Sequence, residues 1–380
     1  MTIKIFSGYN FSRRQFLQIG GLALMAPLKT SSRELTLYVG TYTLGTSGKG
    51  EGIYIYRMDQ LTGELKRAGS VKSENPSFLT LDPAKRFLYA VNEKPEGMVS
   101  AFRIDRQTGD LSFVNQQSSQ GADPCHLSVE SGGKSVLVAN YTSGTLAVLP
   151  IGRDGALGAA VDVKQHEGSG PREQQKGPHA HCIKLDRANR HAFAADLGID
   201  KLMIYRFQSG KLEPAQQPSV FLHAGAGPRH LAFHPNGDFL YVINELDSSL
   251  TTFKYNATQG TLTAFESLST LPRDFTGLSF CADIHVAKSG RFVYGSNRGH
   301  NSIVVFAIDP RSGRLSLVEH VSTEGKWPRN FTIDPSGSFL LVANQHTDNV
   351  VVFRIDQQTG RLTSTGHVTE IPTPVCLQFL

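Results

Sequence analysis

Residues 229–268 carry the pattern that decides the fold: RHLAFHPNGDFLYVINELDSSLTTFKYNATQGTLTAFESL. Four short runs, at 229–233, 239–244, 250–255 and 262–268, are rich in β-branched, aromatic and other apolar residues. The turns between them contain Pro, Asn and Gly, which is typical of antiparallel strands joined by tight connections. The stretch therefore predicts a sheet of four short strands.

The second of these strands recurs along the chain at a spacing of about 50 residues, a period typical of propellers and solenoids. The seven copies are residues 37–41 (LYVGT), 88–93 (LYAVNE), 137–141 (LVANY), 193–197 (FAADL), 240–245 (LYVINE), 293–298 (VYGSNR) and 340–345 (LLVANQ). No segment after the first 34 residues has a sustained 3.6-residue apolar period. We therefore predict an all-β fold, a seven-bladed β-propeller of four-stranded antiparallel blades.

The two ends of the repeat region predict how the ring closes. The repeats begin with a second strand at 35–40 and end with a first strand at 374–379 (PVCLQF). Pairing these strands makes one composite blade, with three strands from the N-terminal end and one from the C-terminal end, and leaves no exposed edge. We expect residues 35–380 to form one propeller domain, and we expect it to be a monomer.

Residues 1–34 have the features of an export leader. SRRQFL at 12–17 has the twin-arginine pattern, and the apolar run at 19–28 that follows is too short to span a membrane. We expect the twin-arginine export machinery to carry the folded protein to the periplasm or otherwise out of the cytoplasm. The alternative is a disordered basic tail on a cytoplasmic protein.

Most of the net charge of +5 belongs to this leader, which has five basic residues against one acidic residue. The remaining body is close to neutral, which argues against nucleic acid or an anionic membrane as a partner. The four cysteines occupy comparable strand starts in different repeats: Cys125, Cys182, Cys281 and Cys376. We interpret them as small buried residues and not as a disulfide framework or a metal site.

Comparison of the repeats separates shared positions from irregular ones. The innermost strand begins at Ser77, Cys125, His181, Arg229, Ala282, Arg329 and Val375. The second strand ends at Gly40, Asn92, Asn140, Asp196, Asn244, Asn297 and Asn344, and the next residues are Thr41, Glu93, Tyr141, Leu197, Glu245, Arg298 and Gln345. In an antiparallel hairpin the start of one strand lies beside the end of its partner, so these positions should meet at one mouth of the central channel. The regular Asn position is predicted to hydrogen-bond the adjacent turn.

Four irregular residues in three consecutive blades are the main candidates for a site: His181, Arg229, Glu245 and Arg298. Charged side chains at these inner positions are costly to bury unless they form pairs or bind a ligand. The structural alternative is an Arg229–Glu245 ion pair that braces one blade, with His181 a satisfied channel histidine. From these positions alone the two interpretations are balanced.

Four further residues flank the same mouth and are candidates for substrate binding: His179, His230, His300 and Arg329. Two long connections, at 166–178 and 269–281, are predicted to enter this mouth on either side of the cluster. Loops over the mouth of a channel are a common place for a pocket.

The order and spacing of four motifs resemble the seven-bladed lactonase family. These are GPHAHC (177–182), GPRHLAFHP (227–235), YVINEL (241–246) and SNRGHNSI (296–303), and the similarity covers nearly the whole chain after the leader. The family includes bacterial propeller-type 6-phosphogluconolactonases and the fungal carboxymuconate-lactonizing enzyme. The His, Arg, Glu and Arg of the site proposed for the lactonizing enzyme match His181, Arg229, Glu245 and Arg298.

The resemblance implies hydrolysis of a sugar (aldono)lactone to its acid. Histidine suits acid–base chemistry, so His181 would take that role with Glu245 orienting it or sharing the proton. Arg229 and Arg298 would stabilise an oxyanion and anchor an acidic group of the substrate. No GxSxG sequence suggests an acyl-enzyme, and we expect no metal or other cofactor.

Two alternatives stay open. One is a lactonizing cyclase or isomerase that acts on a dicarboxylate, and the other is a non-catalytic propeller that serves as a binding platform. The leader also bears on the substrate, because 6-phosphogluconolactone is a cytosolic intermediate. An exported enzyme would act on an unphosphorylated sugar lactone or another cyclic ester.

Overall fold

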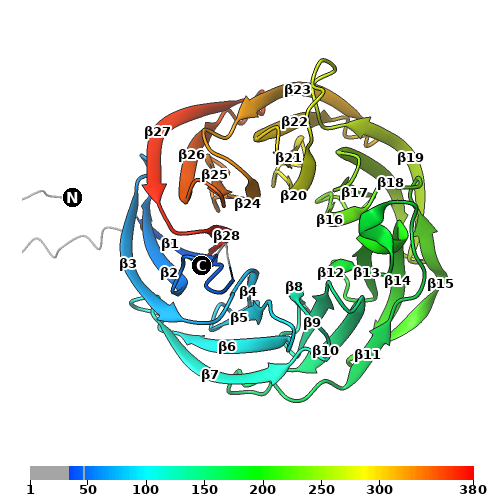
Figure 1. The fold of residues 1–380 in the computed structure, drawn as a ribbon, viewed down its shortest axis with the longest axis horizontal. Helices are drawn as coiled ribbons and strands as arrows, with labels where there is room; N and C mark the ends of the chain where they lie inside the picture. Colours follow the sequence, from blue (N-terminus) through cyan, green and yellow to red (C-terminus); the bar gives the residue numbers. More distant parts are fainter. Residues whose placement is uncertain (1–33, 46–47) are drawn as a thin grey trace, which may run out of the picture. The chain divides into compact units, whose positions relative to one another are not determined.

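Seven antiparallel sheets of four strands surround a common axis in the part of the chain that the structure describes (Figure 1). The structure is a computed structural model, and it describes residues 34–45 and 48–380. The leader predicted at 1–34 therefore lies outside the described residues except for Glu34, where the first strand begins. The predicted all-β, seven-bladed propeller is confirmed.

Each blade has its innermost strand nearest the axis. In blade order the strands are β28 (Pro374–Phe379), β1 (Glu34–Thr41), β2 (Gly52–Asp59) and β3 (Leu65–Lys72); β4 (Leu79–Leu81), β5 (Phe87–Asn92), β6 (Met98–Ile104) and β7 (Leu111–Ser118); β8 (Pro124–Val129), β9 (Ser135–Asn140), β10 (Thr145–Pro150) and β11 (Asp162–Gln165); β12 (Ala180–Leu185), β13 (His191–Asp196), β14 (Lys201–Gln208) and β15 (Lys211–Phe221); β16 (Pro228–Phe233), β17 (Phe239–Asn244), β18 (Ser249–Asn256) and β19 (Thr261–Ser269); β20 (Phe280–Val286), β21 (Phe292–Arg298), β22 (Ser302–Ile308) and β23 (Leu315–Ser322); and β24 (Pro328–Ile333), β25 (Phe339–Asn344), β26 (Asn349–Ile355) and β27 (Leu362–Glu370).

The described helices are two short 3₁₀ turns, η1 (Glu173–Gln175) and η2 (Leu197–Ile199). Among the described residues, no helix is long and apolar enough to cross a membrane.

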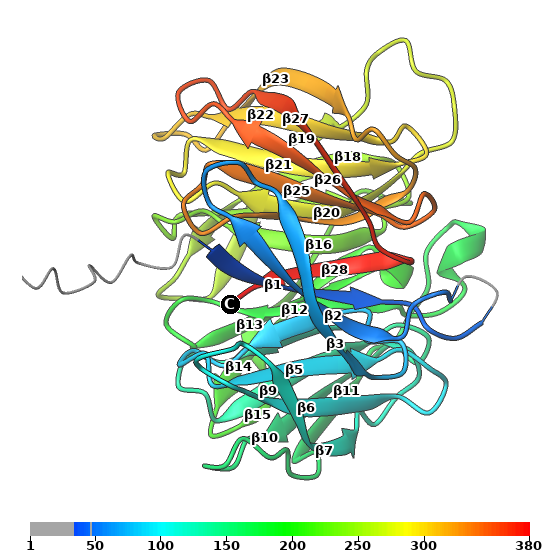
Figure 2. The ribbon, with the colours of Figure 1, turned by 90° about the vertical axis from the view of Figure 1, so that its left-hand side faces the viewer.

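The ring closes through the composite blade that the sequence predicts. β28 pairs antiparallel with β1, and Leu37 lies opposite Phe379 and Val39 opposite Leu377. Figure 2 shows the red β28 beside the blue β1. This pairing satisfies the edge of β1 that would otherwise lie open to another chain.

Apolar packing between neighbouring blades holds the ring together. Seven apolar clusters of described residues each combine side chains from two adjacent blades. One of them packs Ile243 of β17 against Val293 of β21 and Val304 of β22. The second strand of a blade has neighbours on both faces, so all six residues of β17 are buried. Each fully buried side chain of this kind contributes about 1.5–3 kcal/mol.

A repeated hydrogen bond also joins the blades. The hydroxyl groups of Tyr38, Tyr89, Tyr241 and Tyr294 donate to the carbonyl oxygens of Gly109, Gly155, Gly313 and Gly360 in the next blade. The tyrosines are buried, so burial raises the pKa of each hydroxyl and it stays protonated as a donor.

The regular Asn position has the structural role predicted for it. The side-chain amides of Asn92, Asn140, Asn297 and Asn344 donate to backbone carbonyls of the connection that enters the blade. Asn244 departs from this pattern, because its amide donates to the hydroxyls of Ser249 and Thr251.

The assignment of the first blade was wrong by one residue. Thr41 lies opposite Pro374, as Asn244 lies opposite Pro228, so Thr41 and not Gly40 ends the second strand in register with the Asn position. The residue that follows is then Tyr42. The error arose because Gly40 was taken as the last residue of the second strand, whereas β1 continues for one more residue, to Thr41.

We expect Tyr241→Phe to lower the free energy of unfolding by about 1–2 kcal/mol, because the buried Gly313 carbonyl loses its donor. Phe193 occupies the same strand position in another blade, so a phenylalanine side chain can be accommodated there. Chemical denaturation would measure the difference. An unchanged unfolding midpoint would show that the inter-blade bond contributes nothing to stability.

Candidate functional site

A β-bulge at the start of the innermost strand places the side chains of the site. The pairing of β8, β12, β16 and β24 with the second strand skips one residue in each blade, and the skipped residues are Cys125, His181, Arg229 and Arg329. A bulged residue leaves the alternation of the sheet and its side chain is re-aimed. The irregular position read from the sequence is therefore the bulge position of the blade.

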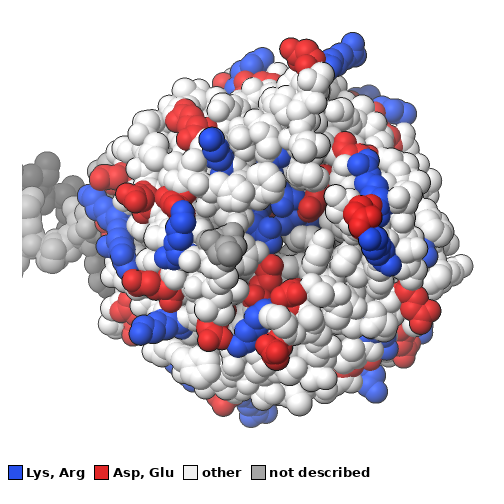
Figure 3. Space-filling view, viewed as in Figure 1, with Lys and Arg blue, Asp and Glu red and all other residues white. Residues whose placement is uncertain are grey.

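The bulged side chains and the ends of the second strands surround a pocket of about 230 Å³. The described residues that line it are Tyr42, Glu93, Cys125, Tyr141, His181, Glu245, Arg298 and Arg329. Figure 3 shows basic and acidic side chains meeting in the hollow at the centre of one face. The structure thus brings together three of the four main candidates, and Arg329 joins them.

Arg229 lies at the floor of this pocket and not in its wall. It is 2 % exposed and lines a small cavity next to the pocket, with Cys125, His230 and Arg329 among its neighbours. Its Nε donates to Glu245 Oε2 at 2.9 Å, and its Nη1 donates to the Ala282 carbonyl at 2.5 Å. The ion pair considered as the structural alternative is therefore present.

Glu245 holds two arginines. Arg298 Nη2 lies 2.8 Å from the same Oε2 atom that accepts from Arg229. Burial alone would raise the pKa of the Glu245 carboxyl, but Arg298 and then Arg229 outweigh it, and the pKa is lowered. Burial lowers the pKa of Arg298 to about 10 against the opposing effect of Glu245, so Arg298 and Glu245 are both charged at neutral pH. The described contacts include no hydrogen bond between Glu245 and His181, so the orienting role that the resemblance implied for Glu245 is not seen.

The pocket wall and the floor beneath it together contain an excess of positive charge. In the wall Arg298 and Arg329 face Glu93 and Glu245, and Arg229 in the floor adds a third guanidinium group. Arg329 is the least constrained arginine: its Nη2 lies 3.7 Å from Glu93 Oε1, and its guanidinium lies over the Tyr42 ring at 5.3 Å. Because a buried charge without a partner is costly, the pocket favours an anion or a group that becomes negative.

His181 is a neutral base at the wall of the pocket. Its side chain is buried, and burial together with Arg229 and His230 lowers its pKa well below 6.5. The nearest polar side chain recorded for it is Cys125, whose sulfur lies 3.6 Å from Nδ1. Burial raises the pKa of the Cys125 thiol well above its ordinary value, so this thiol stays protonated. The imidazole can therefore take a proton at neutral pH.

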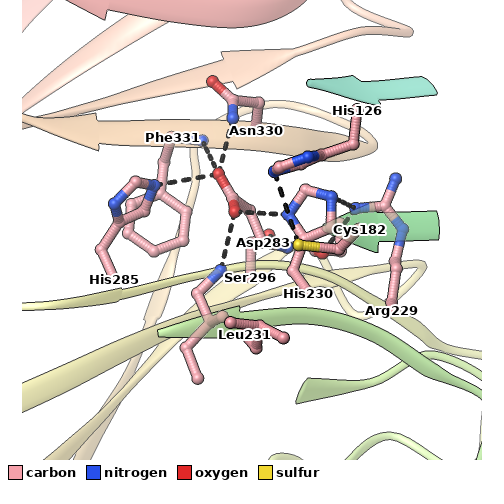
Figure 4. A network of polar contacts seen from close by, with 12 residues as sticks. His126, Cys182, Arg229, His230, Leu231, Asp283, His285, Ser296, Asn330 and Phe331 are labelled. Carbon is pink, nitrogen blue, oxygen red and sulfur yellow. Dashed lines mark hydrogen bonds and ion pairs between the residues drawn. The ribbon is translucent and has the colours of Figure 1, made fainter. Parts of the chain in front are cut away.

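A buried hydrogen-bond network supports Arg229 from below (Figure 4). His230 Nδ1 donates to Asp283 Oδ1 at 2.8 Å, and Asp283 Oδ2 accepts from His285 at 3.0 Å and from Asn330 at 2.6 Å. The bond to Asp283 leaves His230 Nε2 unprotonated, 3.4 Å from Arg229 Nη1. Burial and Arg229 lower the pKa of His230 to about 4, so it stays neutral beside the guanidinium.

The other two histidine candidates lie outside the pocket lining. His179 stacks on the Tyr141 ring at 4.5 Å, and its Nδ1 lies 3.0 Å from the Tyr141 carbonyl. His300 bonds Ser302 Oγ at 2.7 Å and meets the Phe275 ring edge-on at 4.7 Å. His230 belongs to the network under Arg229. These three were predicted because they flank the mouth in sequence. None of them lines the pocket, although His179 packs behind the lining residue Tyr141.

Four lining residues were not chosen as candidates from the sequence: Tyr42, Glu93, Cys125 and Tyr141. Glu93 was identified from the sequence only as a residue that follows a second strand, and the structure places its Oε1 atom 3.7 Å from Arg329 Nη2. Tyr42 was hidden by the one-residue slip in the first blade, and alignment of Leu37-Tyr38 with Leu88-Tyr89 would have found it. Cys125 is buried and free, as are the other three cysteines, so their predicted burial is confirmed.

The fold and this pocket define a class of protein: a closed seven-bladed propeller with a small, charged pocket at one mouth of its axis. Residues 36–379 match the family described as Lactonase, 7-bladed beta-propeller. The chain belongs to this family of lactone hydrolases, which are carboxylic ester hydrolases.

Named relatives support this membership. The chain is 42 % identical over 346 residues to the 6-phosphogluconolactonase of Bacillus subtilis, covering 90 % of this chain and 97 % of the relative. It is 36 % identical over 312 residues to the 6-phosphogluconolactonase of Formosa agariphila, covering 79 % and 86 %. The structure of the Pseudomonas aeruginosa periplasmic gluconolactonase superposes with a TM-score of 0.87 at 35 % identity, covering 91 % of this chain and 99 % of that one.

We expect Asp283→Asn to lower the free energy of unfolding at neutral pH by about 2–4 kcal/mol, because His230 and His285 lose a charged acceptor. Burial alone would raise the pKa of Asp283, but the contacts with His285 and His230 outweigh burial and hold this pKa well below 3.8. Its stabilisation is therefore complete above pH 3.8 and is lost as the pH falls through the lower native pKa. Denaturation across pH would show the difference from wild type shrinking in acid. The exposed Asp238→Asn is the matched control, and an equal effect in both variants would contradict the assignment.

Proposed function

We propose that this protein hydrolyses a sugar lactone in the pocket around His181. The observation that carries the proposal is the neutral His181 beside a buried excess of positive charge. Hydrolysis of a lactone needs a base for the attacking water and a positive environment for the carbonyl oxygen, which becomes negative. The pocket supplies both within about 230 Å³, a space suited to a small ring.

His181 acts first as a base and then as an acid. It takes a proton from water as the oxygen attacks the lactone carbonyl, and the carbonyl π electrons move to oxygen. When the tetrahedral intermediate collapses, the ring C–O bond breaks and the imidazolium returns its proton to the leaving alkoxide. The low pKa of His181 makes its protonated form a strong donor for this second step.

The arginines have different roles in this proposal. Arg329 has the most freedom to bind the developing oxyanion or an acidic group, because its closest carboxylate lies at 3.7 Å. Arg298 lines the same pocket while it is held by Glu245. Arg229 is a positioning residue, since its recorded hydrogen bonds go to Glu245, Ala282 and His230. Glu245 keeps the arginines in place and is not the partner of His181.

The lactonizing cyclase or isomerase is a weaker alternative. A dicarboxylate brings two negative charges, whereas three guanidinium groups against two carboxylates leave one positive charge to match them. The predicted export leader favours a plain sugar lactone over a phosphorylated one, because 6-phosphogluconolactone is a cytosolic intermediate.

We expect the protein to hydrolyse glucono-1,5-lactone, and His181→Ala to reduce kcat by about a hundredfold or more. The assay would compare plain and phosphorylated aldonolactones, with and without a chelator, after subtraction of spontaneous hydrolysis. The control is His367→Ala, on the outer strand β27. The described residues hold no group of three or more His, Cys, Asp and Glu side chains suited to a metal, and metal independence is a prediction that the chelator tests.

The same assay gives a pH dependence. Since the base must be neutral and its pKa lies well below 6.5, kcat/KM should be constant near pH 7 and fall only at a pH below 6.5. Activity that is unchanged in His181→Ala, or that is lost to the chelator, would contradict the mechanism.

We also propose that the protein is exported by its twin-arginine leader. Support comes from the SRRQFL sequence at 12–17 and from the similar Pseudomonas aeruginosa gluconolactonase, which is described as periplasmic. A fusion of residues 1–34 to a reporter that functions only after export should be active. Changing Arg13 and Arg14 to Lys should abolish the signal, and a signal that persists would exclude this export route.

A further inference from the structure

A second, more open cavity of about 410 Å³ continues the pocket toward solvent. The two cavities share Tyr42, Glu93, Arg298 and Arg329, so a ligand in one can extend into the other. Trp327 lines only the outer cavity, and it is the one tryptophan of the chain.

Comparison of the blades makes Trp327 an exception. In five blades the residue two positions before the bulged or strand-starting residue has a left-handed backbone, and these residues are Asn75 (φ 39°), Asp123 (φ 53°), Gly227 (φ 65°), Trp327 (φ 66°) and Thr373 (φ 39°). Four of them are small. A bulky side chain in this conformation is an outlier, and it costs about 1–3 kcal/mol unless the surroundings compensate.

The contacts of the Trp327 ring include a charged residue of the site. The Arg298 guanidinium lies over the ring at 5.3 Å, the His346 ring stacks on it at 4.8 Å, and the Phe280 ring lies tilted to it at 6.2 Å. The turn itself is held by backbone bonds: Trp327 N donates to Asn301 Oδ1 at 2.8 Å, and Gln345 N donates to the Trp327 carbonyl at 3.0 Å. These backbone bonds do not need an aromatic side chain. The aromatic ring is therefore needed for its own contacts, and among them Arg298 and the cavity belong to the site.

We propose that the outer cavity is a subsite for the hydroxylated substituents of a sugar lactone, with Trp327 as its specificity-determining wall. The inference rests on the proposed lactone hydrolysis. The ester ring occupies the inner pocket beside His181, and the substituents extend past Arg298 along the indole. The cation–π contact holds Arg298 at the boundary of the two cavities. The apolar indole face suits the C–H groups of a sugar. Gln345 also lines this cavity, and its Oε1 atom, which has no hydrogen-bond partner among the described residues, can accept from a sugar hydroxyl.

The first test compares Trp327→Asn with wild type on two six-membered lactones, glucono-1,5-lactone and δ-valerolactone, which lacks hydroxyls. The variant should fold, because Asn75 occupies the same position in another blade, and thermal unfolding would verify this. We expect kcat/KM to fall about tenfold more for gluconolactone than for valerolactone, with partial rescue in Trp327→Phe. An equal loss on both lactones, or no loss on either, would overturn the subsite.

The second test does not depend on turnover. Because Trp327 is the single tryptophan, fluorescence of the full chain excited at a wavelength that tyrosine does not absorb reports on this cavity. Gluconate should produce a saturable change in emission, and 5-hydroxyvalerate should not. If no lactone is hydrolysed, the proposed function fails while this titration still decides the subsite: a saturable change supports it, and a flat titration with gluconate overturns it.

Discussion

The site depends on a single carboxylate that holds two buried guanidinium groups. Glu245 Oε2 accepts from Arg229 at 2.9 Å and lies 2.8 Å from Arg298 Nη2. Without this carboxylate, the two cations would repel each other in a place with little solvent to screen them. Arg229 is then fixed from below by His230, which in turn is fixed by Asp283. A rigid charged floor allows Arg329 and His181 to stay available to a ligand.

The β-bulge explains why this chemistry fits a propeller. A regular innermost strand would place alternate side chains in the two inter-blade interfaces, where only apolar or paired groups are tolerated. The extra residue in β12, β16 and β24 does not follow that alternation. His181, Arg229 and Arg329 can therefore occupy these positions without disturbing the packing of the blade. Function therefore varies at the bulge position and at the residue that follows the second strand, while the remainder of the blade keeps its repeated pattern.

The sequence predicted the blades well because each one is a local unit. Turn residues and apolar runs mark the strands within a blade, and the unpaired strands at the two ends require closure. The candidate site was predicted in part. Comparison of the repeats found His181, Glu245 and Arg298, since irregular charges stand out against a regular background. It placed Arg229 among the main candidates and Arg329 among the flanking ones, whereas in the structure Arg229 lies in the floor and Arg329 in the wall. The sequence could not predict this difference because it depends on contacts between blades. Tyr42 was missed through an error of one residue in the register of β1.

The sequence by itself determined the architecture, the position of the site at one mouth, and the residue types available there. The reason is that strand periodicity and turn chemistry act over a few residues, and repetition places them around the ring. Only the tertiary structure decided which charges pair, and hence which remain for a ligand. Glu245 pairs with Arg229 of its own blade and with Arg298 of the next, and Glu93 reaches Arg329 across the channel. The Arg229–Glu245 pair was already considered from the sequence because both residues belong to one blade, whereas the contacts of Arg298 and Arg329 join different blades. The strength of all three contacts depends on burial, which is a property of the closed ring.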